Sequence, residues 1–96
     1  MGTYPIALAC ATHQVPFVVA APWSTFDPDL EHGGQMPLEE RPEQEVLHCA
    51  EVPMAPPGVH ARNPAYDVTP GRLVTAIVTD RGVLRAPFEA AIKTLR

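Results

Sequence analysis

The distribution of proline restricts this chain more than any other feature. Of the twelve prolines, seven fall between Pro22 and Pro57, where several charged residues also lie. Proline fixes φ and removes a backbone donor, so this stretch cannot contain long regular elements. Compact domains seldom contain loops longer than about 12 to 15 residues without structure of their own. We therefore expect the stretch to fold over a partner surface or to belong to something larger.

The remaining composition is typical of one small folded domain. The chain has 96 residues, of which 46% are hydrophobic and 19% charged, with a net charge of -4. Its seven basic residues form no cluster, which argues against a nucleic-acid or anionic-membrane surface. Cys10 and Cys49 are too few and too far apart for a disulfide framework. The apolar run near the N-terminus is too short to span a bilayer, so we expect a cytoplasmic chain.

The first elements are read from apolar spacing. Residues Thr3 to Gln14 predict a helix, with Thr3 as its cap and Pro5 in its first turn. Residues Pro16 to Ala21 are apolar without alternation, as in a parallel strand that is covered on both faces. A helix that leads into such a strand indicates an α/β unit.

The second half of the chain gives weaker patterns. Short strands are predicted near residues 46–49 and 59–61. The β-branched segment 73–79 has strand propensity, but the preceding Thr-Pro and the following Gly82 favour a second helix, and we predict a helix there. A final helix begins at Pro87 and carries an apolar stripe.

These elements predict the fold class. The predicted strands are too few to form a sheet that covers its own edges. We therefore expect an α/β chain that forms one end of a parallel sheet with flanking helices.

No predicted group of residues forms an active site or a metal site. The four histidines have neither the i, i+4 spacing nor the Cys/His spacing of zinc ligands. Ser24 does not lie in a G-x-S-x-G turn, and Cys10 lies among apolar neighbours in a helix. The acidic residues that surround Arg41 are interpreted as a charged surface turn. We expect no catalytic residue, no metal and no cofactor in this chain.

The stretch "RNPAYDVTP", residues 62–70, has two interpretations. Asn63 precedes a proline and is extended, while Asp67 can accept hydrogen bonds from nearby backbone amides, as residues before a helix often do. Alternatively, Asn63 and Asp67 border a substrate pocket at the carboxyl end of a strand, where open α/β sheets bind ligands. Both interpretations remain open on the sequence.

Several blocks of this sequence resemble one enzyme family. "ARNPAYDVTPGRLVTAIVTDRGVL", "GTYPIALACATHQVPFVVAAPWSTFD" and "MPLEERPEQEV" are similar, in order, to the C-terminal part of the methylthioribose-1-phosphate isomerases. That family shares a superfamily with regulatory initiation factor 2B subunits and with ribose-1,5-bisphosphate isomerase. The resemblance implies that residues 1–96 are part of a Rossmann-like C-terminal domain of a homodimeric sugar-phosphate isomerase in methionine salvage.

The resemblance also implies that this chain is inactive alone. In the family, the catalytic Cys and Asp and a substrate-binding Asn-Lys pair all precede the block that matches "GTY". The leading hypothesis is a C-terminal fragment that binds the sugar phosphate only together with the missing N-terminal part, or that associates with itself. The alternatives are a free-standing interaction module of the superfamily and a relative of ribose-1,5-bisphosphate isomerase.

Overall fold

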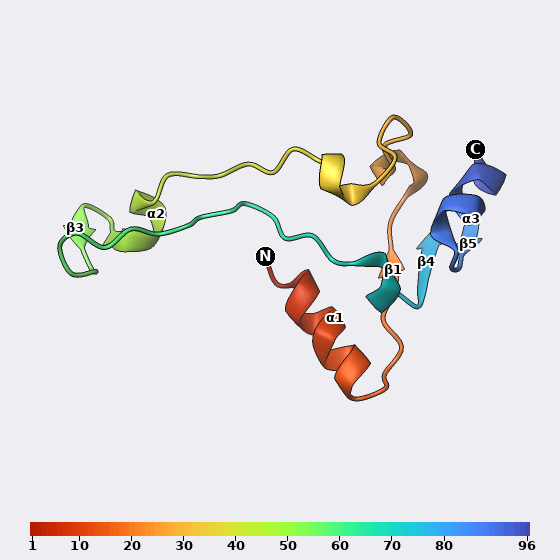
Figure 1. Cartoon of the computed structure of the whole chain (residues 1–96), viewed down its shortest axis with the longest axis horizontal. Coiled ribbons are helices and arrows are strands. Elements are labelled where there is room, and N and C mark those ends of the chain that lie inside the picture. Colours follow the sequence, from red (N-terminus) through yellow and green to blue (C-terminus); the bar gives the residue numbers. More distant parts are fainter.

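The chain folds into a small mixed sheet with helices and a long projecting arm (Figure 1). The computed structural model describes residues 1–96 in full. A three-stranded sheet has the order β1 (Val18–Ala20), β4 (Ala76–Thr79), β5 (Gly82–Leu84). β1 pairs with β4 in parallel, as expected, but β5 is antiparallel to β4. The observed class is therefore α/β with a mixed sheet. The expected cover on both faces of β1 is not observed, because Val18 is 51% exposed.

Helix α1 (Thr3–Thr12) and helix α3 (Phe88–Leu95) confirm the predicted first and last helices. α1 is apolar on every side, yet it buries only Ala7, and Ile6 remains 58% exposed. Thr3 does not cap the helix, because the N-cap position is Gly2, which has no side chain to accept a hydrogen bond. The prediction of a Thr3 cap was wrong.

The predicted helix over residues 73–79 was also wrong. Pro70 precedes only the 3-10 turn η3 (Gly71–Leu73), after which the chain extends into β4 and turns back into β5. Gly82 has φ +143 and lies at the hairpin turn, so it does not end a helix. The β-branched residues follow their strand propensity because β1 and β5 supply pairing partners on both sides.

The second part of the proline-rich stretch, together with the residues that follow it, forms the arm, residues 37–66. Two limbs, residues 37–47 and 59–66, lie side by side, and Arg41 N and Asn63 O are joined at 2.8 Å. The tip contains α2 (Gln44–Leu47) and a two-stranded hairpin, β2 (His48–Cys49) with β3 (Val52–Pro53). The predicted strand near 46–49 is thus half helix, and residues 59–61 form no strand.

Two further 3-10 turns, η1 (Trp23–Thr25) and η2 (Gly33–Gln35), lie in the long connection that leads from β1 to the arm.

The core is small: only Ala7, Ala76 and Leu84 are fully buried. The radius of gyration is 17.4 Å, whereas a compact domain of this length has about 12.5 Å. The arm, seen at the left of Figure 1, accounts for this extended shape. None of the helices has the length and apolar character required to cross a membrane.

Candidate functional site

The turns that follow β1 and β4 meet at the carboxyl ends of the parallel strands. Trp23 N donates to Asp80 Oδ1 at 2.6 Å. The indole ring of Trp23 stacks on Phe26 at 5.0 Å between centroids, and the guanidinium group of Arg81 lies 4.8 Å from the indole centroid. Open α/β sheets bind ligands at this edge. The contact between the two turns therefore defines the candidate site.

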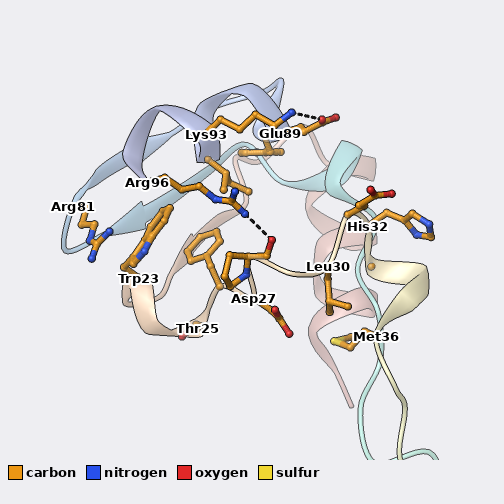
Figure 2. A pocket seen from close by; sticks show the side chains of 16 residues that line it. Trp23, Thr25, Asp27, Leu30, His32, Met36, Arg81, Glu89, Lys93 and Arg96 are labelled. Carbon is orange, nitrogen blue, oxygen red and sulfur yellow. Dashed lines mark hydrogen bonds and ion pairs between the residues drawn. The ribbon is translucent and has the colours of Figure 1, made fainter.

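A groove of about 1240 Å³ opens beside this contact, between α3 and the connection that contains η1 and η2. Figure 2 shows Lys93 directed at Glu89, 2.8 Å away, and the Arg96 side chain reaching back across the groove. Arg96 Nη2 donates to Pro28 O at 2.6 Å. The apolar lining of the groove is formed by six side chains: Trp23, Phe26, Leu30, Met36, Phe88 and Ile92. Two of the basic side chains at the groove therefore already have partners within the chain.

Asn63 lies in the return limb of the arm. Its Nδ2 donates to Pro42 O at 3.0 Å and to Glu45 Oε2 at 3.1 Å, and its backbone amide donates to Glu40 Oε1 at 2.9 Å. Asn63 thus joins the two limbs. Its predicted place at the border of a substrate pocket stays a prediction.

Asp67 lies at the N-terminus of α1. Its Oδ2 accepts hydrogen bonds from Gly2 N and Tyr4 N, each at 3.0 Å. The bond from the Tyr4 amide, followed by that from Gly2, holds the pKa of Asp67 below its ordinary value. The sequence suggested that Asp67 bonds nearby amides, but these amides lie more than sixty positions away. Its predicted role at a pocket border also remains a prediction.

The acidic block before the arm tip fastens one limb to the other. Glu40 pairs with Arg62 at 2.9 Å, and this hydrogen bond is the main cause of a lowered pKa of Glu40. Glu43 Oε2 accepts from the backbone amide of Ala61 at 3.2 Å, which lowers the pKa of Glu43 in the same way. These side-chain carboxylates supplement the few backbone bonds between the limbs, which contain prolines that lack a donor. The block lies at the surface, as predicted, and it also joins the two limbs, which the sequence did not indicate.

Neither of the two thiols lines the groove. Cys10 is partly covered within α1, and Cys49 is exposed in the hairpin at the arm tip. No cluster of three or more His, Cys, Asp or Glu side chains has the arrangement of a metal site.

Asp80 and Arg81 were not predicted as site residues from the sequence. Both residues directly follow β4, and a strand there would have placed them at the carboxyl edge beside the turn after β1. The β-branched run 73–79 was the sequence signal for this strand, but it was interpreted as a helix.

The family of this chain follows from a match to a family model over most of its length. The model of the initiation factor 2 subunit family matches residues 1–86. The chain belongs to this family.

Two curated relatives have the name methylthioribose-1-phosphate isomerase. The chain is 55% identical, over all its 96 residues, to the methylthioribose-1-phosphate isomerase of Heliobacterium modesticaldum, of which it covers 27%. It is 55% identical over 95 residues to the enzyme of the same name from Anaeromyxobacter sp. strain K, of which it covers 28%. This member of the family therefore spans about a quarter of the length of these relatives.

Two solved structures have the same fold over 99% of this chain. The 5-methylthioribose 1-phosphate isomerase from Pyrococcus horikoshii OT3 is 44% identical, with a TM-score of 0.87, and the chain covers 26% of it. The subunit delta of translation initiation factor eIF-2B from A. fulgidus is 38% identical, with a TM-score of 0.84, and the chain covers 28% of it. The extended arrangement is thus similar to a part of larger folded proteins.

Proposed function

We propose that this chain forms part of an S-methyl-5-thioribose-1-phosphate isomerase. The reaction is the reversible aldose–ketose isomerisation of methylthioribose 1-phosphate to methylthioribulose 1-phosphate, a step of methionine salvage. The observation that carries the proposal is the 55% identity to an enzyme of this name along the whole chain. We also propose that the chain is inactive by itself and acts together with the remaining three quarters of the family fold.

The carboxylates near the candidate site already accept hydrogen bonds within the chain, which supports the proposal that the chain alone is inactive. Isomerisation of this type requires an acid and a base within hydrogen-bond reach of the substrate. Asp80 and Asp67 are both occupied by backbone amides of this chain. Cys10 and Cys49 stand on different elements, in α1 and at the arm tip. The acid and base are therefore expected to come from the companion part.

The exposed surface supports a companion of considerable size. The chain exposes 7303 Å², about 1,900 Å² more than a compact protein of its mass. A standard interface covers only about 800 Å² of each partner. The excess exposed area is larger than one partner's share of such an interface. Exposed apolar side chains lie on α1 and at the unpaired edge of β1, where Val18 is 51% exposed. A further parallel strand on that edge would continue the sheet in a Rossmann-like manner, and association of two copies would cover more.

A graft tests the proposal. In the Heliobacterium modesticaldum enzyme, the matching 27% of the chain is replaced by this sequence, giving a protein called here the grafted isomerase. We expect it to convert methylthioribose 1-phosphate with a kcat/KM within about tenfold of the parent, a loss of about 1.4 kcal/mol. The separate 96-residue chain should show no turnover.

The matched control is Ala76→Asp in the grafted isomerase, which puts a charge at a buried position of β4 and should abolish folding and activity. Turnover by the separate chain would contradict the need for a companion. A grafted protein that is folded but inactive would contradict the isomerase assignment.

The likeness to the eIF-2B subunit delta favours a second candidate, an interaction module without catalysis. The arm tip is suited to such a role, since Val52 and Met54 are 60% and 69% exposed. The two functions differ in one measurement. For a module, the separate chain forms a stable complex with a companion protein in size-exclusion chromatography with light scattering, and the grafted isomerase remains inactive.

A further inference from the structure

The segment from Asp67 to Thr75 lies along α1 and is fastened at both ends; we call it the α1 strap. At one end Asp67 Oδ2 accepts from Gly2 N and Tyr4 N. At the other end, Phe17 N donates to Thr75 Oγ1 at 2.9 Å and Thr75 N donates to Phe17 O at 2.8 Å. Between the ends, η3 contacts α1. The strap thus connects the start of α1 to the start of β4.

The α1 helix has no cap of its own at the Asp67 end. The first amides of a helix lack intrahelical acceptors and need other partners. Gly2 has no side chain, and the first turn contains no acidic residue. Pro5 has no amide proton, so it needs no partner. A carboxylate near a helix N-terminus is also favoured by the helix dipole. Asp67 therefore supplies from a distant segment what the local sequence lacks.

Asp67 also lies just beyond the arm. Ala65 N donates to Glu39 O at 2.9 Å, which is the last backbone bond between the limbs, and Asp67 follows two positions later. Asp67 therefore holds the end of the return limb at the start of α1.

We propose that Asp67 is a positioning residue that latches the α1 strap, and with it the base of the arm, to the N-terminus of α1. The latch makes the arm, α1 and β4 one unit, because the strap is held at both ends. The Asp67 carboxylate also supplies an acceptor for the first backbone amides at the N-terminus of α1. The proposal concerns the fold of this chain and stands independently of the isomerase assignment.

Selective labelling with ¹⁵N-tyrosine tests the latch on the 96-residue chain, because it has only two tyrosines. The amide of Tyr4 donates to Asp67, whereas Tyr66 is 62% exposed. We expect the Tyr4 amide to exchange with solvent at least about tenfold more slowly than the Tyr66 amide, each relative to its intrinsic rate. Asp67→Ala should remove this difference, and Asp67→Asn, which keeps an acceptor oxygen, should retain part of it. Asp29→Ala, an exposed acid in the same chain, is the matched control and should leave the difference unchanged.

¹⁵N-phenylalanine labelling separates loss of the latch from loss of the fold. The Phe17 amide bonds at the other end of the strap, and it should remain protected in Asp67→Ala. Equal exchange of Tyr4 and Tyr66 in the unaltered chain would overturn the proposal. So would an unchanged Tyr4 in Asp67→Ala, or loss of Phe17 protection together with that of Tyr4.

Discussion

The guanidinium group of Arg81 lies over the indole ring of Trp23, 4.8 Å from the ring centroid, while Phe26 stacks on the indole at 5.0 Å. Arg81 follows β4 and Trp23 follows β1, so the contact joins the two parallel strands beyond their carboxyl ends. The backbone bond from Trp23 to Asp80 reinforces the junction. The candidate site is thus built from two turns that the parallel pairing brings together.

Removal of this contact should be visible in the fluorescence of the chain, which contains a single tryptophan. Arg81→Ala removes a cation–π interaction worth about 0.5 to 1 kcal/mol at an exposed site. We expect a changed emission intensity and a slightly lower unfolding midpoint in urea. Arg85→Ala removes an exposed arginine that directly follows β5 and is the control. An unchanged spectrum in Arg81→Ala would contradict the contact.

Leu84 is the largest fully buried side chain, with 1% exposure. Leu84→Ala should lower the free energy of unfolding of the grafted isomerase by about 2 to 5 kcal/mol, because it leaves a cavity in a very small core. The neighbouring Val83 is 56% exposed, so Val83→Ala should cost far less. Equal effects of the two substitutions in urea denaturation would show that β5 is oriented differently.

Gly82 has φ +143, a conformation that residues with a Cβ rarely adopt. Gly82→Ala should therefore destabilise the grafted isomerase by about 1 kcal/mol or more. Gly71→Ala is the matched control, since a Cβ there would meet only Phe88 at 3.9 Å and φ is ordinary. The comparison is made by thermal unfolding, and a more stable Gly82→Ala variant would contradict the hairpin geometry.

Asn63 joins the limbs of the arm through Pro42 and Glu45. Asn63→Ala should speed cleavage of the arm in limited proteolysis, because both bonds are lost. Gln44→Ala, an exposed amide in α2, is the control and should not change the cleavage rate. Steady-state kinetics of the same variants in the grafted isomerase test the pocket-border prediction. A raised KM in Asn63→Ala supports that prediction, and an unchanged KM contradicts it.

Acid should release Asp67 from the start of α1. The bonds from Tyr4 and Gly2 lower the pKa of Asp67 in the folded chain, so the carboxylate stabilises the fold above its unfolded pKa of about 3.9. This contribution is lost as the pH falls through the lowered, folded value. The ¹⁵N shift of the Tyr4 amide should follow that titration, with a midpoint below the ordinary Asp value, while Tyr66 does not. A Tyr4 midpoint at or above the ordinary value would contradict the bond.

The elements that the sequence predicted correctly are those with strong local patterns. α1, β1 and α3 have uninterrupted or striped apolar residues bounded by proline or by polar turns. The segment from 73 to 79 was misread because a Thr-Pro start and a later glycine fit two structures. Pairing with β1 and β5 decides for a strand, and pairing is not a local property.

The candidate site was less accessible to sequence reasoning. Asn63 and Asp67 are close in the sequence, yet Asn63 fastens the arm and Asp67 caps α1. Asp80 and Arg81 gain their place only from the register of β1 with β4.

The sequence alone was sufficient for the α/β class, for the resemblance to the family, and for the absence of long regular elements from the proline-rich part of the chain. The tertiary structure alone decided which groups meet. Asp67 binds Tyr4, Asp80 binds Trp23 and Glu45 binds Asn63. Hydrogen bonds of this kind join segments that are far apart along the chain, and their partners depend on the path of the backbone between them. A local pattern therefore identifies a donor or an acceptor, but only the folded chain identifies its partner.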